Sequence, residues 1–264
     1  MRLPFKRQFR QLQIKRYMAT RARVRAVFDE DRQSFLDLVS IAFNNEIVIG
    51  YQIKLLKKYL IDEFSYTVVD NSSNPDKQKV IAQLCIDSGV NYVLPPSNPF
   101  LGEVGSGSHG ATLNWAYKNF ICRRKPKHFG FLDHDVFPVE RTSILEKLSD
   151  SPIFGKIDVR GDRWYLWSGF SFFCYDFLKG EKVDFMPEPG VDTGGKNWHS
   201  VYSKIDKSLL SPLAISYDNL RPGDNKQTDM YERMGSWVHT VNASEWVGAP
   251  HKNALVVNFL DRYL

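Results

Sequence analysis

The sequence predicts an α/β fold, a three-layer α/β/α sandwich whose central sheet is mixed but mostly parallel. Two observations lead to this class. Short apolar runs alternate with helical stretches between residues 37 and 132, and polar side chains follow several of those runs. Strands that alternate with helices form parallel βαβ units, and their right-handed crossovers place helices on both faces of the sheet. The chain has 264 residues and is 43% hydrophobic, which suffices for one substantial core.

The alternation of strands and helices lies in the first half of the chain. Residues 37–43 form a buried apolar run, and residues 47–60 follow it with apolar side chains at helical spacing. A second run at residues 66–69 ends in a polar, turn-forming segment. The expected elements after it are a helix over about 76–88, a strand at 91–94, a glycine-rich loop at 102–110, a helix over 111–120 and a strand at 129–132.

The second half is less regular. Residues 164–173 alternate aromatic with small side chains, which favours one or two strands over a pocket. Residues 187–197 contain two prolines and three glycines, so we expect a loop there and a helix from Trp198. Five aromatic side chains are candidates either to stack on flat or sugar rings or to pack in the core: Trp164, Tyr165, Trp167, Phe170 and Trp198.

The N-terminal segment is strongly basic. Residues 1–28 hold nine Lys or Arg and no Asp or Glu, with Phe5, Phe9 and Leu12 among the interleaved apolar side chains. Such a segment can lie on an anionic membrane, bind nucleic acid, or remain a solvated tail. We expect contact with an anionic membrane or a tail, and no nucleic acid. We therefore divide the chain into a basic arm of residues 1–31 and a single domain of residues 32–264.

The cysteines and the lack of long apolar runs bear on location. Cys85, Cys122 and Cys174 are odd in number and far apart, so they predict neither a disulfide framework nor a zinc site. The chain has no apolar run of membrane-spanning length and no signal-peptide core at its start. The expectation is a cytoplasmic protein, with peripheral membrane contact through residues 1–28.

The central motif is Asp133-His134-Asp135, which directly follows an apolar strand. Two carboxylates at this spacing can share a hard divalent cation such as Mg²⁺ or Mn²⁺, although an Asx turn that ends the strand is the alternative. Asn44 and Asp70 also follow predicted strands. Ligands of open parallel sheets bind beyond the carboxyl ends of the strands, so these groups are expected in one crevice.

With these motifs the sequence resembles the GT-A class of glycosyltransferases, most closely the inverting family 2 type, from about Leu36 to His239. The resemblance implies the GT-A fold. It also implies that Asp70 contacts the nucleobase, that Asp133 meets the ribose or the metal ion, and that Asp135 ligates the metal ion. The stretch 109–114 resembles the helix start that precedes this motif. Further donor-binding candidates on the matching segments are Asn44, Asn71 and Asn114.

Three later segments extend the resemblance. Ser168-Gly169 is similar to the family's glycine loop, where the missing Cβ lets the donor sugar approach the backbone. Asp192 stands where the family places its catalytic base, although Val191 replaces the glutamate that usually precedes it. His239 resembles the C-terminal metal ligand. We expect Asp192 to lie partly buried under aromatic walls.

These resemblances imply a metal-dependent glycosyltransferase that uses Mn²⁺ or Mg²⁺. It would transfer a sugar from a nucleoside-diphosphate-sugar donor to a hydroxyl of a carbohydrate or lipid-linked acceptor, with inversion, in glycan or polysaccharide synthesis. One alternative is a sugar-nucleotide nucleotidyltransferase, but residues 42–45 lack the glycine-rich, Arg-containing loop of those enzymes. The other is a non-catalytic nucleotide- or carbohydrate-binding module, which would not need Asp192.

Overall fold

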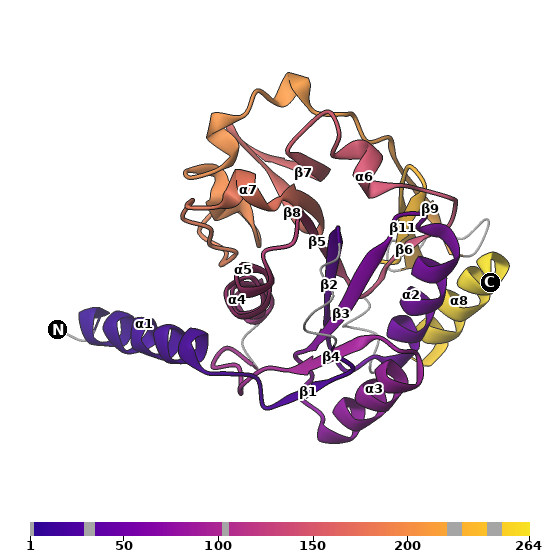
Figure 1. The fold of residues 1–264 in the computed structure, drawn as a ribbon, viewed down its shortest axis with the longest axis horizontal. Coiled ribbons are helices and arrows are strands. Elements are labelled where there is room, and N and C mark those ends of the chain that lie inside the picture. The colour runs from indigo at the N-terminus through magenta and orange to yellow at the C-terminus, as the bar shows by residue number, and fades with distance from the viewer. Residues whose placement is uncertain (1–2, 29–34, 102–105, 221–228, 242–249) are drawn as a thin grey trace.

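The computed structural model describes residues 3–28, 35–101, 106–220, 229–241 and 250–264. A seven-stranded sheet of order β1-β4-β3-β2-β5-β8-β7 forms the middle layer (Figure 1). The inner strands β4, β3, β2 and β5 are parallel, whereas β1, β8 and β7 run antiparallel to their neighbours. The strands are β1 (Val24–Ala26), β2 (Leu36–Ala42), β3 (Phe64–Asp70), β4 (Asn91–Leu94), β5 (His128–Asp133), β7 (Ile153–Arg160) and β8 (Arg163–Cys174).

Helices cover both faces of this sheet, because side chains of a strand alternate between its faces. Leu36 and Leu38 of β2 pack with α2 (Glu46–Tyr59) and α3 (Pro75–Asp87) on one face. Val39 and Ile41 pack on the other face with α4 (Ser106–Ala116), which continues through a π-helical turn (Tyr117–Ile121) into α5 (Cys122–Arg124). The predicted three-layer α/β/α class is confirmed.

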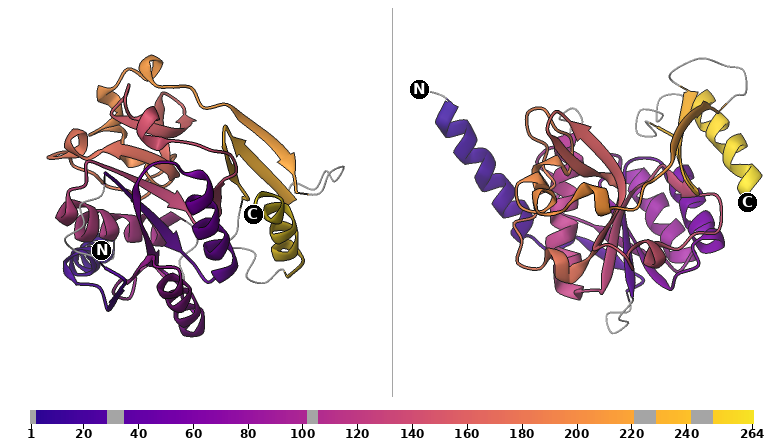
Figure 2. Two further views of the ribbon diagram at one scale, coloured as in Figure 1. Left: turned by 45° about the vertical axis from the view of Figure 1, so that its right-hand side comes forward. Right: turned by 90° about the horizontal axis from the view of Figure 1, so that it is seen from above.

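A smaller antiparallel sheet of order β6-β11-β10-β9 lies beside the C-terminal helix (Figure 2). Phe137 of the small sheet, Leu55 of α2 and Val256 of α8 share a third apolar cluster. The remaining elements are β6 (Val136–Pro138), β9 (Ile215–Asn219), β10 (Met230–Met234), β11 (Trp237–His239), α6 (Ile144–Lys147), α7 (Tyr175–Leu178) and α8 (Pro250–Leu260).

The N-terminal basic segment is structured. Residues Leu3–Ala19 form helix α1, which projects from the body of the molecule (Figure 2). Tyr17 is buried against α4, and β1 pairs with β4 at the edge of the large sheet. Residues 24–26 are therefore part of the sheet, although they fall within the segment 1–31 that the sequence assigns to an arm. No helix of the described residues is long and apolar enough to cross a bilayer.

Two sequence predictions differ from the structure, whereas the strand predicted at residues 164–173 is confirmed. The helix expected at 111–120 begins at Ser106, inside the glycine-rich segment, because Gly107 and Gly110 are accommodated within a helix. The confirmed strand over the aromatic segment 164–173 is β8. The helix expected from Trp198 is absent: a 3₁₀ turn over Gly195–Trp198 is followed by further short turns, because Gly194, with φ of 91°, redirects the backbone.

Candidate active site

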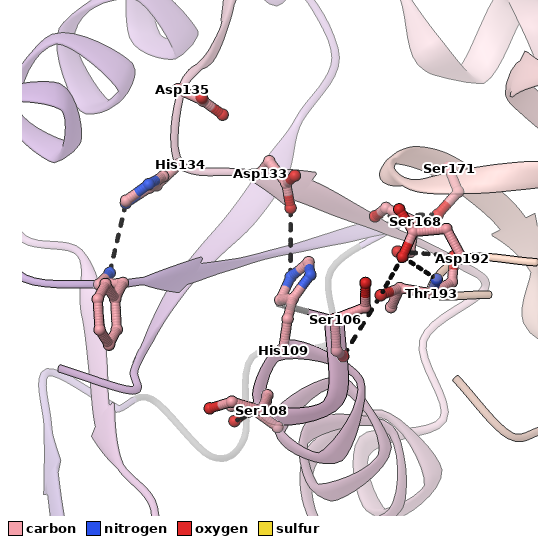
Figure 3. Close-up of polar contacts among 12 residues, drawn as sticks. Ser106, Ser108, His109, Asp133, His134, Asp135, Ser168, Ser171, Asp192 and Thr193 are labelled. Carbon is pink, nitrogen blue, oxygen red and sulfur yellow. Dashed lines mark hydrogen bonds and ion pairs between the residues drawn. The ribbon is translucent and has the colours of Figure 1, made fainter. Parts of the chain in front are cut away.

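The candidate site lies where β2, β3 and β5 end. Ala42 pairs with Asp70, and Ile41 pairs with Asp133, so these strands finish at the same edge of the sheet. Asn44, Asp70 and Asp133 thereby share this edge, as the sequence predicts for parallel strands. The first turn of α4 approaches the same edge and supplies His109 (Figure 3).

Asp133 is held by His109. The Nε2 atom of His109 lies 3.2 Å from Oδ1 of Asp133, and Figure 3 shows the two side chains pointing toward each other. Burial raises the pKa of Asp133, and the neighbouring His109 opposes that rise. The approach of α4 depends on Gly110, because a Cβ there would lie 2.5 Å from the carbonyl oxygen of Phe185. The resulting pair fixes the direction of the first carboxylate of the motif.

Gly169 closes the opposite side of Asp133. Leu132 pairs with Phe170 in the antiparallel β5–β8 ladder, which brings Gly169 beside Asp133. A Cβ at position 169 would lie 2.6 Å from Oδ2 of Asp133 and would also collide with the ring of Trp167. Any larger residue at position 169 must displace one of these side chains, so glycine is what leaves Asp133 and Trp167 in their positions.

Asp135 and His239 form a second cluster at the junction of the two sheets. Nε2 of His239 lies 3.5 Å from Oδ2 of Asp135, and the backbone N–H of Thr240 donates to the carbonyl of Asp135 at 3.0 Å. On the other side of the ring, Nδ1 of His239 lies 3.2 Å from Oε2 of Glu232. The indole of Trp167 packs on the imidazole with ring centroids 4.6 Å apart.

The charged side chains of this cluster shift one another's pKa values. Burial lowers the pKa of His239, but Asp135 and Glu232 outweigh it and raise the value to about 9. Burial raises the pKa of Glu232, but its bonds to His239 and Lys156 outweigh this and lower the value to about 2. Lys156 lies 2.8 Å from Oε1 of Glu232. A buried carboxylate that holds one imidazole nitrogen is the usual partner of a metal-binding histidine.

Asp135 and His239 are the candidate protein ligands for a divalent cation. Among the described residues, no three His, Cys, Asp or Glu side chains converge closely enough to form a complete metal site. The predicted ligands divide instead: Asp133 faces His109, whereas Asp135 faces His239. An oxygen and an imidazole ligand from the protein leave several positions open, and Mg²⁺ or Mn²⁺ sites commonly fill such positions with phosphate oxygens and water.

Two buried groups hold the turn that carries the motif. The amide of Gln52 donates to the backbone carbonyls of Asp133 and Val136 at 2.8 and 2.7 Å. Nδ1 of His134 accepts the backbone N–H of Phe43 at 3.3 Å, the contact drawn at the left of Figure 3. Burial lowers the pKa of His134, which suits a neutral acceptor nitrogen. His134 therefore joins β2 to the motif and points away from Asp133.

Asp192 belongs to the loop at residues 187–197, which contacts β8 through the hydrogen bond between Ser168 and Thr193. Its Oδ1 atom accepts the backbone N–H of Thr193 at 2.7 Å. Thr193 is anchored on both sides, because its hydroxyl donates to the carbonyl of Ser106 and its own carbonyl accepts from Ser168. Figure 3 shows these side chains grouped beside the Asp133–His109 pair. Asp192 is exposed, so the expectation that aromatic walls bury it is wrong.

The nucleotide-binding candidates form a hydrogen-bonded network. Asn44 adopts a φ of 50°, and its Oδ1 and Nδ2 atoms bond to the backbone of Asn74 and the hydroxyl of Ser73. Both carboxylate oxygens of Asp70 are occupied, one by the N–H of Ser72 and one by the hydroxyl of Tyr92. Burial raises the pKa of Asp70, which is 1% exposed.

Asn71 connects this network to α4. Its Nδ2 atom donates to the hydroxyl of Ser108 at 3.0 Å, and its Oδ1 atom accepts from Asn98. Asn114 lies deeper, where its amide bonds to Asp184 and to the backbone N–H of Phe185. Asn71 therefore lies at the edge of the sheet where the site is. Asn114 instead holds residues 184–185 against α4.

The aromatic candidates separate by burial. Tyr165 and Phe170 are 0% exposed, and Trp164 is also buried, so these three pack in the core and do not offer a stacking face. The strand that carries them is covered on both faces, which the sequence pattern does not reveal. Trp167 and Trp198 are half-buried.

Several residues of the site were not singled out from sequence. His109 lies in the helix start at residues 109–114, but its contact with Asp133 depends on how α4 packs against the sheet. Glu232, Lys156 and Gln52 come from elements that are distant in sequence, and no local pattern marks them. Their roles depend on tertiary pairing.

No protein-family profile matches the chain, and no curated protein sequence matches it. Solved structures do match. A mannosyltransferase, PcManGT from Pyrobaculum calidifontis in complex with GDP-Man and Mn²⁺, is 13% identical with a TM-score of 0.41, over 65% of this chain and 53% of that chain. The mannosyltransferase Ktr4p from S. cerevisiae is 11% identical with a TM-score of 0.39, over 64% and 65%.

The galactosyltransferase LgtC, in complex with donor and acceptor sugar analogues, is also similar. It is 16% identical with a TM-score of 0.35, over 53% of this chain and 58% of that chain. All three are glycosyltransferases. This chain matches less than two thirds of the length of each of them.

Proposed function

We propose that this protein is a GT-A-type glycosyltransferase that moves a sugar from a nucleoside-diphosphate-sugar to an acceptor hydroxyl. The observation that carries the proposal is the meeting of four elements at one sheet edge. β5 supplies Asp133, α4 supplies His109, β8 supplies Gly169, and the loop after β8 supplies Asp192. A carboxylate paired with a histidine, a glycine against that carboxylate and a separate exposed carboxylate are parts that transfer to a hydroxyl can use.

The donor would lie across the strand ends. Asn44, Asn71 and Asp133 are the candidates for the nucleoside, with Asp70 shaping the turn beneath them. Ser168 and Gly169 would face the donor sugar. Asp135 and His239 would hold Mn²⁺ or Mg²⁺, and such an ion neutralises the charge of a leaving diphosphate.

The protein's part in the reaction is positioning and proton removal. The acceptor oxygen forms a bond to the anomeric carbon while the bond from that carbon to the diphosphate oxygen breaks. Asp192 takes the hydroxyl proton as general base, and the nucleoside diphosphate leaves. A single base and an in-line displacement invert the anomeric configuration.

The two rival functions differ in what they consume. A nucleotidyltransferase would take a nucleoside triphosphate and a sugar phosphate and release pyrophosphate. A binding module would consume nothing, and substitution of Asp192 would then leave every measured property of the ligand complex unchanged. The exposed, anchored Asp192 favours the transferase over the module.

The test is a panel of nucleotide-sugars assayed for hydrolysis or transfer and for thermal stabilisation, with Mn²⁺, with Mg²⁺ and with excess chelator. At least one donor should show turnover with the metal and none with chelator. Asp135→Ala should abolish turnover while the protein stays folded. Asp150→Ala, at an exposed carboxylate outside the site, is the control. Full turnover in chelator would exclude the metal, and no response to any donor would exclude the transferase.

A further inference from the structure

We propose that α1 and the segment that follows it form a docking surface for an anionic lipid bilayer. Charge is the first observation. Residues 1–28 hold nine Lys or Arg and no acidic residue, which leaves 26 Lys or Arg against 30 Asp or Glu in the rest of the chain. The net positive charge of this protein therefore comes from one segment, and the rest of the chain is slightly acidic.

The second observation is that the described contacts between α1 and the body lie on one face of the helix. Tyr17 is 4% exposed, and Ile14 and Met18 pack against the same core cluster. The indole N–H of Trp115 donates to the carbonyl of Thr20 at 2.9 Å, and Asn119 donates to the carbonyl of Met18 at 3.1 Å. These contacts set the rotation of the helix about its axis.

The opposite face combines apolar and basic side chains. Phe9 is 60% exposed and Leu12 is 63% exposed. Residues three and seven apart share one face of a helix, so Phe9, Leu12 and Arg16 form a stripe along it. Arg16 within this stripe is exposed, and so is Lys15 beside it. A helix with apolar side chains flanked by cations lies in the interface of an anionic bilayer.

The surface continues past the helix toward the edge of the large sheet where the candidate site lies. Val24, which is 45% exposed, pairs with Leu94 at the carboxyl end of β4, and the N–H of Arg23 donates to the carbonyl of Leu94 at 2.7 Å. The chain therefore runs from α1 onto the sheet at the edge where Asp70 and Asp133 lie. A bilayer on α1 would present a lipid-linked acceptor at that edge. This last step rests on the proposed function, whereas bilayer binding does not.

The exposed apolar pair favours a bilayer over nucleic acid as the occupant. Phosphate backbones are bound by cations, and the affinity depends chiefly on salt. A bilayer additionally accepts Phe and Leu side chains below the headgroups, and their burial contributes to binding. The two occupants therefore differ in their response to loss of Phe9 and Leu12.

The experiment is co-flotation of the full chain with vesicles. Deletion of residues 1–28 is unsuitable, because it removes β1 from the sheet and Tyr17 from the core. At low ionic strength the protein should float with phosphatidylcholine vesicles that contain phosphatidylserine, and not with phosphatidylcholine alone. Lys15→Gln with Arg16→Gln should lower the partition ratio roughly 25-fold, about fivefold for each cation.

Phe9→Ala with Leu12→Ala should lower the partition ratio about tenfold at unchanged charge. Matched controls lie elsewhere on the surface: Ile61→Ala with Leu209→Ala for exposed apolar side chains, and Lys147→Gln with Lys179→Gln for exposed cations. Neither control should change binding. The proposal is overturned if the protein ignores anionic vesicles, if the Phe9 and Leu12 variant binds them as well as the unaltered protein, or if short nucleic-acid duplexes bind while vesicles do not.

Discussion

Oε2 of Glu232 lies 3.2 Å from Nδ1 of His239, on the side of the imidazole ring opposite to Asp135. Glu232 comes from β10 and is 1% exposed, and Lys156 of β7 lies 2.8 Å from its Oε1 atom and 2.9 Å from its Oε2 atom. The carboxylate thus determines which nitrogen of His239 points toward Asp135. A buried partner of this kind orients a metal-binding histidine and raises its basicity.

Glu232→Gln should therefore weaken the response to the divalent cation. Loss of such a partner typically costs 10–100-fold in metal affinity, so half-maximal turnover or nucleotide binding should need about that much more Mn²⁺. Titration of Mn²⁺ at a fixed nucleoside diphosphate concentration measures the shift. Tyr217→Phe is the control, because it removes a 2.9 Å bond to the same carboxylate without touching His239. An unchanged Mn²⁺ requirement in a folded Glu232→Gln protein would assign Glu232 a structural role alone.

Gly169→Ala should impair the site without unfolding the protein. The new Cβ falls on Oδ2 of Asp133 and on Trp167, and both are side chains that can move. A misplacement of about 1 Å at a reacting centre costs on the order of 100-fold in rate, so turnover should fall by about that factor. Gly50→Ala in α2 meets only an ordinary van der Waals contact and should leave turnover unchanged. Equal turnover in the two variants would remove Asp133 from the site.

Asp70→Ala should lower stability and nucleotide affinity together. The substitution leaves Tyr92 and the N–H of Ser72 without their acceptor, which costs about 1–3 kcal/mol for each unpaired buried group. Urea unfolding should show this loss, and calorimetry should show weaker nucleoside diphosphate binding because the turn that holds Asn44 and Ser72 loosens. Tyr92→Phe breaks only one of these bonds and should have the smaller effect on both. Full nucleotide affinity in a destabilised Asp70→Ala protein would confine Asp70 to the fold.

The parallel half of the fold was predictable because its signals are local. Residues 37–43 and 66–69 are apolar runs followed by polar turns, and each became a strand within a few residues of its expected bounds. The placement of Asp133 after a strand followed from the same pattern. Strand ends of a parallel sheet meet at one edge, so part of the site was also accessible from the sequence.

The rest of the site depends on contacts between distant segments. Gly169 meets Asp133 only because β8 pairs antiparallel with β5, and no spacing in the sequence encodes that register. Glu232 reaches His239 through the β10–β11 pairing. For Tyr165 and Phe170 the sequence left stacking and core packing open. Both pack in the core because β8 is an inner strand covered on both sides, where aromatic side chains fill the interior.

Asp192 and Glu188 are the two carboxylates of the loop at residues 187–197, and they differ in their partners. Glu188 lies 2.7 Å from Arg163 and 3.4 Å from His199, so its charge is already paired. Asp192 is exposed and bonds to Thr193, which Ser106 and Ser168 hold beside the Asp133–His109 pair. A base must be near the hydroxyl and unprotonated, and its position must be fixed. Asp192 meets the positional requirement better than Glu188.

Asp192→Asn keeps the size of the side chain and its acceptor oxygen for the N–H of Thr193 but removes the basic oxygen. Turnover should fall by about 10²–10⁴-fold, because general-base assistance is lost, while donor affinity stays nearly constant. Glu188→Gln should leave turnover within a few-fold of the unaltered protein and should lower thermal stability slightly, because Arg163 loses its charged partner. Single-turnover rates and calorimetric donor affinity, measured on both variants, separate the two effects. Near-native rates in Asp192→Asn combined with a collapse in Glu188→Gln would move the base to Glu188, since the carboxylate that takes the proton is the one whose charge the rate depends on.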